Sequence, residues 1–323
     1  MFRQVGLIGA CLLAFTASPA LAEDNASNYP SRPIHLIVGF AAGGGNDVIA
    51  RIYGQKLSED LGQPVIVENR PGAGAIVATG YVAKATPDGY TLLIGATGMA
   101  INQAVYAKLP YDSVRDFVAI SELASFPLIM VVNASSSIKS VADFVTFAKA
   151  NPDKTNYSSA SATFQLVTEL FKQKTGAPML AIPYKSANEM VLAVISGQVT
   201  TTIADSGPVS PQVKAGKVRA LAITAPKRVA DFPDLPTMKE AGADVDAIIW
   251  TGVFAPKATP AGVVKKLESE FMKVARRPDV AARLKAIGVD AVGTSSDEFA
   301  QILKSDIARW GAVAKSANIK IQQ

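Results

Sequence analysis

Reactive side chains are scarce in this chain of 323 residues, which contains a single cysteine and a single histidine. Zinc sites built from cysteine and histidine, cysteine–histidine nucleophiles and centres with several histidine ligands need more of these residues and are therefore excluded. Charge is also modest, because 32 lysine and arginine residues against 27 aspartate and glutamate residues give a net charge of +5. No dense basic stripe is present, so we expect no nucleic-acid partner.

The one histidine, His35, lies inside an expected strand, whereas ligands of α/β sheets gather at the carboxyl ends of strands. We therefore expect a structural role for it. The sequence lacks the Gly-x-Ser-x-Gly motif of serine hydrolases, and aromatic residues make up only 7%, few for a sugar-cleaving enzyme. We expect no catalytic residue, no metal site and no cofactor. The alternative is an exported hydrolase or lyase with an unrecognised pair of carboxylates.

The first 22 residues have the pattern of a secretory signal peptide. Arg3 provides a charged start, residues 5–15 are an apolar run too short to span a bilayer, and Ala20-Leu21-Ala22 is a small-residue cleavage site. A lipid-attachment box ending at Cys11 is the alternative, although it would leave only a few apolar residues before the cut. We expect cleavage of residues 1–22 and a mature, cysteine-free chain that begins at Glu23 in the periplasm.

Short apolar runs and amphipathic helices alternate along the rest of the chain. Strands are predicted at residues 34–39, 65–67, 91–94, 128–132, 218–224 and 248–254. The predicted helix boundaries are Gly62, Gly176, Pro260, Pro278 and the caps Ser140–Asp143 and Ser295–Glu298. This alternation is typical of βαβ units with a largely parallel sheet. The length suggests two domains of about 150 residues each, and because no Ser/Gly-rich linker separates them, they must share the chain through crossing strands.

A glycine cluster, Gly43-Gly44-Gly45, stands between the first strand and the first helix. Free backbone N–H groups and the positive helix end suit a phosphate or carboxylate at such a place. The spacing matches neither a dinucleotide fingerprint nor a P-loop, because Val48 and Gly45-Asn46 stand where glycine and Lys-Ser/Thr are needed. The cluster is therefore a general anion-receiving loop or, alternatively, only a tight turn.

A second candidate loop, Ser158 to Thr163, comes directly before another helix. Its small residues allow a ligand to approach the backbone, and its four hydroxyls can donate and accept hydrogen bonds. The alternative is an ordinary helix cap, which needs only one hydroxyl. Lys185 and Asp205 are lone polar residues at strand ends, and each alone is more typical of surface than of a site.

With these motifs in order, the chain resembles the periplasmic substrate-binding proteins of the tripartite tricarboxylate transporter (Bug) family. The blocks that carry the resemblance run through nearly the whole mature chain. They are Tyr29-Pro30-Ser31-Arg32-Pro33-Ile34, Phe40-Ala41-Ala42-Gly43-Gly44-Gly45-Asn46-Asp47, Val67-Glu68-Asn69-Arg70-Pro71-Gly72-Ala73-Gly74, Pro87-Asp88-Gly89-Tyr90-Thr91-Leu92, Leu109-Pro110-Tyr111-Asp112, Ile182-Pro183-Tyr184-Lys185, Pro233-Asp234-Leu235-Pro236-Thr237 and Phe254-Ala255-Pro256.

The resemblance implies an α/β fold of the two-domain, type II periplasmic binding protein kind, with the ligand in a cleft between domains joined by two crossing segments. Residues 23–124 and 251–323 would form the first domain and residues 125–250 the second. The implied function is capture of a small organic carboxylate by a monomer that delivers it to an integral-membrane permease. A sensor that presents its closed form to a membrane receptor would use the same fold and stays an alternative.

The resemblance also implies the ligand-binding residues. One wall would comprise Phe40, Gly44, Gly45, Asn46 and Asp47; the other wall would comprise Ser158, Ser159, Ser161, Thr163 and Phe164; Thr97 and Asp205 would complete the pocket. Two departures from the family pattern stand out: Ala42 replaces the usual proline, and Phe164-Gln165-Leu166 replaces a polar stretch. The ring of Phe164 favours an aromatic or otherwise apolar carboxylate.

Overall fold

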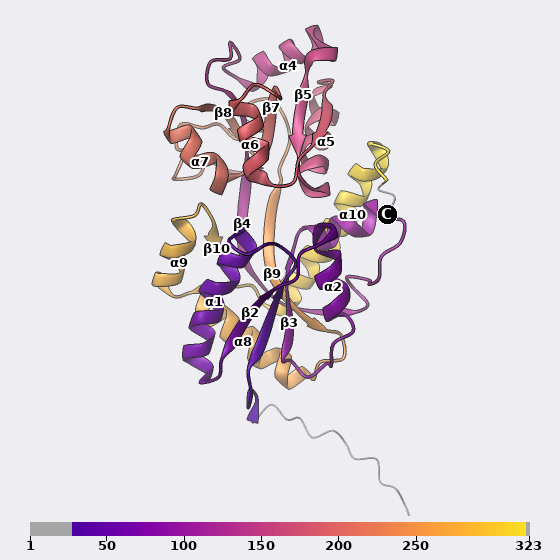
Figure 1. Cartoon of the computed structure of the whole chain (residues 1–323), viewed down its shortest axis with the longest axis vertical. Helices are drawn as coiled ribbons and strands as arrows, with labels where there is room; N and C mark the ends of the chain where they lie inside the picture. Colours follow the sequence, from indigo (N-terminus) through magenta and orange to yellow (C-terminus); the bar gives the residue numbers. More distant parts are fainter. Residues whose placement is uncertain (1–27, 321–323) are drawn as a thin grey trace, which may run out of the picture.

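The chain passes between two lobes on two strands that lie side by side (Figure 1). The computed structural model describes residues 28–320, so the predicted signal peptide, the start at Glu23 and Cys11 lie outside the described residues. β4 (Phe117–Asn133) runs through both lobes, and β9 (Ile248–Pro256) returns antiparallel to it. β4 pairs with β9 up to Pro127 and with β7 (Thr201–Asp205) from Leu128 onward.

The first lobe is built on a sheet in the order β2–β1–β3–β9–β4. β1 (Ile34–Val38) lies between β2 (Val65–Asn69) and β3 (Thr91–Ala96), and these three strands are parallel, as the alternating pattern predicts. β9 joins β3 antiparallel, and β4 pairs antiparallel with β9 and with the short β10 (Asp290–Ala291). The prediction of a largely parallel sheet is therefore wrong: the sheet is mixed, because the two strands that cross between the lobes run in opposite directions. The apolar run of β1 is buried on both faces because helices pack on both sides of the sheet.

The second lobe uses the other half of β4. β8 (Val218–Ile223) and β7 pair with this half, and β5 (Asn156–Ser159) and β6 (Leu180–Pro183) follow β7 in parallel. Residues 128–132 are thus part of one 17-residue strand rather than a strand of their own. The strand is longer than predicted because its burial continues across both lobes, from Phe117 to Val132.

The helices begin and end at residues that the sequence marks. In the first lobe they are α1 (Gly45–Leu61), α2 (Ile76–Val82), α3 (Gly98–Val105), α8 (Ala261–Ala275), α9 (Pro278–Lys285) and α10 (Ser296–Ser316); in the second they are α4 (Val141–Ala150), α5 (Ala162–Thr175), α6 (Ala187–Ile195) and α7 (Ser206–Lys214). Gly62 and Gly176 end α1 and α5 in the left-handed conformation, and Ser295 with Glu298 forms a capping box on α10. No helix within residues 28–320 combines the length and apolar character that crossing a membrane requires.

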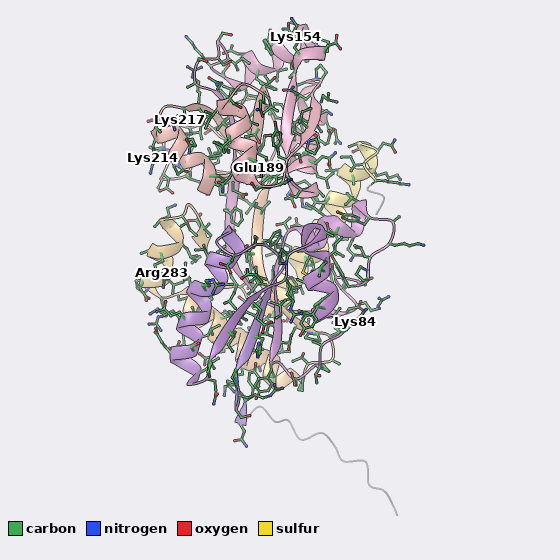
Figure 2. All side chains as sticks on the ribbon, in the orientation of Figure 1. Lys84, Lys154, Glu189, Lys214, Lys217 and Arg283 are labelled. Carbon is green, nitrogen blue, oxygen red and sulfur yellow. The ribbon has the colours of Figure 1, made fainter. Side chains whose placement is uncertain are left out.

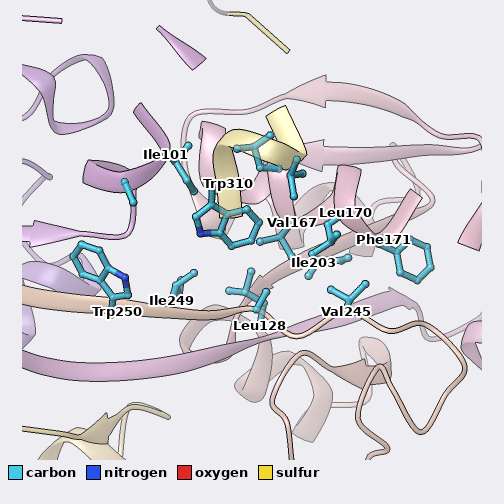
Figure 3. Packing of buried hydrophobic residues seen from close by; sticks show 14 of the residues in the cluster. Ile101, Leu128, Val167, Leu170, Phe171, Ile203, Val245, Ile249, Trp250 and Trp310 are labelled. Carbon is cyan, nitrogen blue, oxygen red and sulfur yellow. The ribbon is translucent and has the colours of Figure 1, made fainter. Parts of the chain in front are cut away.

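Both tryptophans are core residues, with Trp250 2% and Trp310 0% exposed. Figure 3 shows the indole of Trp310, from α10, beside Val167 and Leu170 of α5. The same cluster includes Ile101 of α3, so it joins helices of the first lobe to a helix of the second. One side of the molecule therefore holds the lobes together by apolar packing.

The pairing of β4 also bears on the domain boundaries. Because β4 changes partners between Pro127 and Leu128, and β9 begins opposite Pro127, the chain changes lobe close to these two positions. We propose that residues 23–124 and 251–323 form one domain and residues 125–250 the other.

Candidate ligand-binding site

The two predicted walls lie at the edges by which the lobes face each other. Carboxyl ends of parallel strands meet at one edge of a sheet, so the loop after β1 and Thr97 after β3 share an edge of the first lobe. In the second lobe, Figure 2 places Lys154, just before β5, at the outer end and Glu189, in the first turn of α6, at the edge toward the first lobe. The carboxyl ends of β5 and β7 therefore point toward the first lobe.

The glycine loop after β1 is organised by the carboxylate of Asp47, which is only 2% exposed. Its Oδ2 accepts hydrogen bonds from the N–H of Gly43 and from Arg51 Nε, both at 2.9 Å, and its Oδ1 accepts one from Asn69 Nδ2 at 2.9 Å. Burial works against the charge, but these hydrogen bonds hold the pKa of Asp47 below its usual value. Both oxygens are thus engaged inside the first lobe, which gives Asp47 a positioning role.

Asn69 and Thr251 also hold this wall in place. The amide nitrogen of Asn69 donates to the carbonyl oxygen of Phe40 at 3.0 Å, in addition to its bond with Asp47. Thr251 of β9 donates a hydrogen bond to Oδ1 of Asn46 over 2.6 Å. The Nδ2 group of Asn46 is not part of this bond and donates to no acceptor among residues 28–320. The sequence analysis missed Asn69, Arg51 and Thr251. The position of Asn69, at the carboxyl end of the strand next to β1, was the signal that could have found it.

The hydroxyl and the N–H of Thr97 are hydrogen-bonded to the crossing strand β9. It is 2% exposed, its Oγ1 accepts the N–H of Trp250 at 2.8 Å, and its own N–H donates to the carbonyl oxygen of Trp250 at 3.1 Å. These contacts connect the start of α3 to β9. The structure thus brings Thr97 to the predicted edge but uses its hydroxyl for the fold.

Some hydroxyls of the second wall make hydrogen bonds within the protein, and others do not. Ser158 is fully buried and donates to the carbonyl oxygen of Met190 at 3.2 Å, and Ser159 donates to the carbonyl oxygen of Ser161 at 3.1 Å. The hydroxyls of Ser161 and Thr163 make no hydrogen bond within the described part of the chain. They are half-buried and therefore available to a ligand. Phe164 is half-buried as well and packs against two apolar clusters, so its ring serves the core as well as the wall.

The N-terminus of α5 is not capped by a side chain of the described residues. Ser161 is its N-cap residue but makes no side-chain capping bond among residues 28–320, and its first turn contains no acidic residue. The α6 helix next to it differs, since Ser186 accepts the N–H of Glu189 at 3.3 Å. Free N–H groups and the helix dipole favour an anion at α5. We therefore regard the start of α5 as the best anion-receiving position of this wall.

Asp205 ends β7 at the same edge. Because β5 and β7 pair in parallel at Tyr157 and Thr201, the end of β5, which leads into Ser161, and the end of β7 at Asp205 lie at the same edge of the sheet. Its Oδ1 is buried and has no hydrogen-bond partner in the described chain, and burial raises its pKa to about 7. Such a group is expensive to leave unpartnered, so Asp205 marks a place where a donor or acceptor from outside fits.

Other reactive groups and cavities lie away from these walls. His35 contacts Glu68 of the neighbouring strand through Nδ1, in agreement with a structural role. No cluster of three or more possible metal ligands occurs among residues 28–320. A cavity of about 250 Å³ lies at the outer end of the second lobe beside Asn133 and Lys154, and one of about 500 Å³ lies between α5 and the end of α10. Neither is lined by a predicted site residue, so the candidate site is separate from both cavities.

Known proteins resemble the chain over its whole length. A family model described as tripartite tricarboxylate transporter family receptor matches residues 49–319. BugT of Bordetella pertussis is 32% identical over 100% of this chain and 99% of its own. The structure of R. palustris Rpa4515 with adipate has a TM-score of 0.84 and 34% identity, over 91% of this chain and 100% of that one. MatC from Rhodopseudomonas palustris with bound malate has a TM-score of 0.80 and 29% identity, over 88% and 99%.

These similarities confirm the α/β fold of a two-domain periplasmic binding protein and exclude the alternative of an exported hydrolase or lyase. The chain belongs to the tripartite tricarboxylate transporter receptor (Bug) family and is a carboxylate-binding solute receptor rather than an enzyme.

Proposed function

We propose that this protein captures a small organic acid between its lobes in the periplasm and delivers it, as a monomer, to the integral-membrane permease of a tripartite transporter. The observation that carries the proposal is the start of α5. Its first turn has no acidic residue, and its first N–H groups and the hydroxyls of Ser161 and Thr163 have no hydrogen-bond partner among residues 28–320. The bound adipate and malate of the two related structures support a carboxylate as the ligand.

The proposed ligand contacts follow from which groups are free. On the first lobe, the backbone N–H of Gly45 and the amide of Asn46 supply donors, and Phe40 supplies an apolar surface. The N–H of Gly44 is not free, because it donates to the carbonyl oxygen of Ala41 over 3.2 Å. On the second lobe, Ser161, Thr163 and the N–H groups of α5 supply donors. No arginine occurs in residues 40–47 or 158–164, so N–H groups, hydroxyls and water must meet the charge of the acid.

Closure of the lobes is part of the proposal. A ligand that touches both walls binds the closed arrangement better than the open one and therefore favours it. The two crossing strands are the segments about which the lobes can move. The half-buried ring of Phe164 favours an acid with an apolar or aromatic body over a small polar one.

Native mass spectrometry of protein exported by its own host, followed by calorimetric titration with adipate, malate and benzoate, tests the function. We expect one retained acid per chain and saturable binding of at least one of the three acids. An intact mass that begins at Glu23, without a diacylglyceryl group at Cys11, is expected from the predicted signal peptide. A chain that retains no acid and binds none of the three would contradict the proposal.

A further inference from the structure

Asp205 is placed as an N-cap residue but does not act as one. It precedes α7 with extended backbone (φ −55°, ψ 146°), the geometry in which aspartate usually accepts a helix N–H. Its side chain makes no such bond in the described chain, and Oδ1 is buried without a partner. The carboxyl group therefore does not cap the helix that it precedes.

No positively charged side chain of the described residues compensates the charge that Asp205 would carry when ionised. Burial alone raises its pKa, to about 7, and no charged side chain of the described residues shifts it. The charged groups on the elements packed around it have other partners. Glu189 of α6 accepts the N–H of Lys185, and Lys285 of α9 pairs with Asp231 and Asp290. Near neutral pH, protonation is therefore the way in which this group avoids an uncompensated buried charge.

The start of α5 limits the charge that Asp205 can carry beside a bound anion. Asp205 lies at the same edge of the sheet as Ser161, where the positive end of α5 attracts an anion. An ionised Asp205 beside a bound carboxylate would repel it, whereas a neutral carboxyl group can donate a hydrogen bond to it. The orphaned oxygen and the helix end thus fit one ligand only if the aspartate carries a proton.

We propose that Asp205 binds the ligand in its protonated form and donates a hydrogen bond to a carboxylate oxygen, so that the protein takes up a proton with each acid it captures. This inference rests on the proposed function, since it requires an organic acid between the lobes. It makes Asp205 the residue that selects carboxylates, and it couples their capture to pH.

The test is calorimetric titration of the mature wild-type chain with adipate, malate and benzoate between pH 6 and 8.5, in phosphate and in Tris. The two buffers have different ionisation enthalpies, so the difference in measured heat reports proton uptake. For the tightest-binding acid we expect uptake of about 0.9 proton at pH 8 and a loss of affinity of about eightfold between pH 7.5 and 8.5, from linkage to a group of pKa about 7.

Two variants locate the proton. Asp205→Asn keeps a neutral donor of the same shape, so we expect affinity within about threefold of wild type at pH 6, no pH dependence and no proton uptake. Glu122→Gln is the matched control, because burial and the nearby Asp306 raise the pKa of Glu122 to about 7 as well, and Glu122 is not among the proposed ligand contacts. This variant should keep the pH dependence and the proton uptake.

Each remaining outcome is decisive. Tight binding without proton uptake by the wild type leaves the proposed function standing and overturns the inference, as does proton uptake that persists in Asp205→Asn or disappears in Glu122→Gln. Binding of malate alone, without proton uptake, would instead mean an ionised Asp205 that accepts from the malate hydroxyl. Failure of all three acids to bind overturns the proposed function and this inference with it.

Discussion

Ser206 of the second lobe donates a hydrogen bond from Oγ to the carbonyl oxygen of Gly288 in the first lobe, over 2.7 Å. Gly288 has a φ of +74°, and a Cβ at this position would lie 2.6 Å from the same hydroxyl oxygen. Nearby, Lys285 pairs with Asp231 of the second lobe at 3.3 Å. The corner between α9 and β10 is thus joined to the second lobe at the residue next to Asp205.

Ser206→Ala should shift the lobes toward a more open arrangement. It removes a hydrogen bond between the lobes worth about 1 kcal/mol, so we expect affinity for the carboxylate to fall about fivefold. The radius of gyration of the ligand-free protein, from small-angle scattering, should increase, and saturating ligand should restore the wild-type value. Ser210→Ala, on the same helix, is the control, because no hydrogen bond of that hydroxyl occurs among the described residues. Equal scattering and affinity for the two variants would mean that the contact has no role in closure.

Removal of the free hydroxyls at the start of α5 should weaken binding. Ser161→Ala and Thr163→Ala each delete a donor of the proposed second wall, and we expect each to reduce the free energy of binding by about 1–3 kcal/mol. Ser158→Ala is the matched control. Its hydroxyl is buried and bonded to Met190, so this change should lower the melting temperature and leave affinity unchanged. Calorimetric titration measures the affinity of all three variants, and thermal melts measure their stability. If Ser158→Ala bound the ligand more weakly while Ser161→Ala kept the wild-type affinity, the second wall of the site would lie elsewhere.

The helices and the parallel strands were predictable because local chemistry decides them. The capping box of Ser295 and Glu298 and the left-handed glycines Gly62 and Gly176 end or begin helices by contacts within a few residues. The loop regions of both walls follow from the same rules, since they come at the carboxyl ends of parallel strands.

The use of each side chain was not predictable in the same way. Thr97 bonds to Trp250, which is 153 residues away in the sequence, and Ser158 of β5 bonds to Met190 of α6. Partners so distant depend on how the lobes assemble, and one residue of shift along a strand turns a side chain to the other face. The position of both candidate walls at strand ends could therefore be predicted, but which of their side chains make structural contacts could not.

Asp47→Asn should show that this carboxylate positions the glycine loop. The amide replaces one acceptor oxygen with a donor, which faces the N–H of Gly43 and the guanidinium of Arg51. We expect the loop to shift and affinity to fall about tenfold, equivalent to about 1.4 kcal/mol. Titration of folded protein measures the affinity, and a melt measures the stability separately.

Asp143→Asn is the control for this change. Asp143 also lies in the first turn of a helix and accepts the N–H of the residue four positions earlier, Lys139, but on the second lobe. Both variants should melt earlier than wild type, and only Asp47→Asn should bind more weakly. Equal affinities for the two would remove the positioning role of Asp47.

Stability should fall as the pH rises from about 4 to about 7. Burial, with Asp306 nearby, raises the pKa of Glu122 to about 7 in the folded protein, whereas in the unfolded chain it lies near its ordinary value of 4.5. Between these values the unfolded chain loses its proton first, so the folded state binds more protons and becomes less stable as the pH increases. Glu122→Gln removes the contribution of Glu122 to this fall and leaves that of Asp205, whose pKa is also raised. At pH 8 its free energy of unfolding should exceed that of wild type by about 1–3 kcal/mol, and at pH 4 the two should agree. Urea titrations of both proteins across this pH range provide the measurement. A variant less stable than wild type at pH 8 would show that the ionised carboxylate of Glu122 is stabilised by a partner after all.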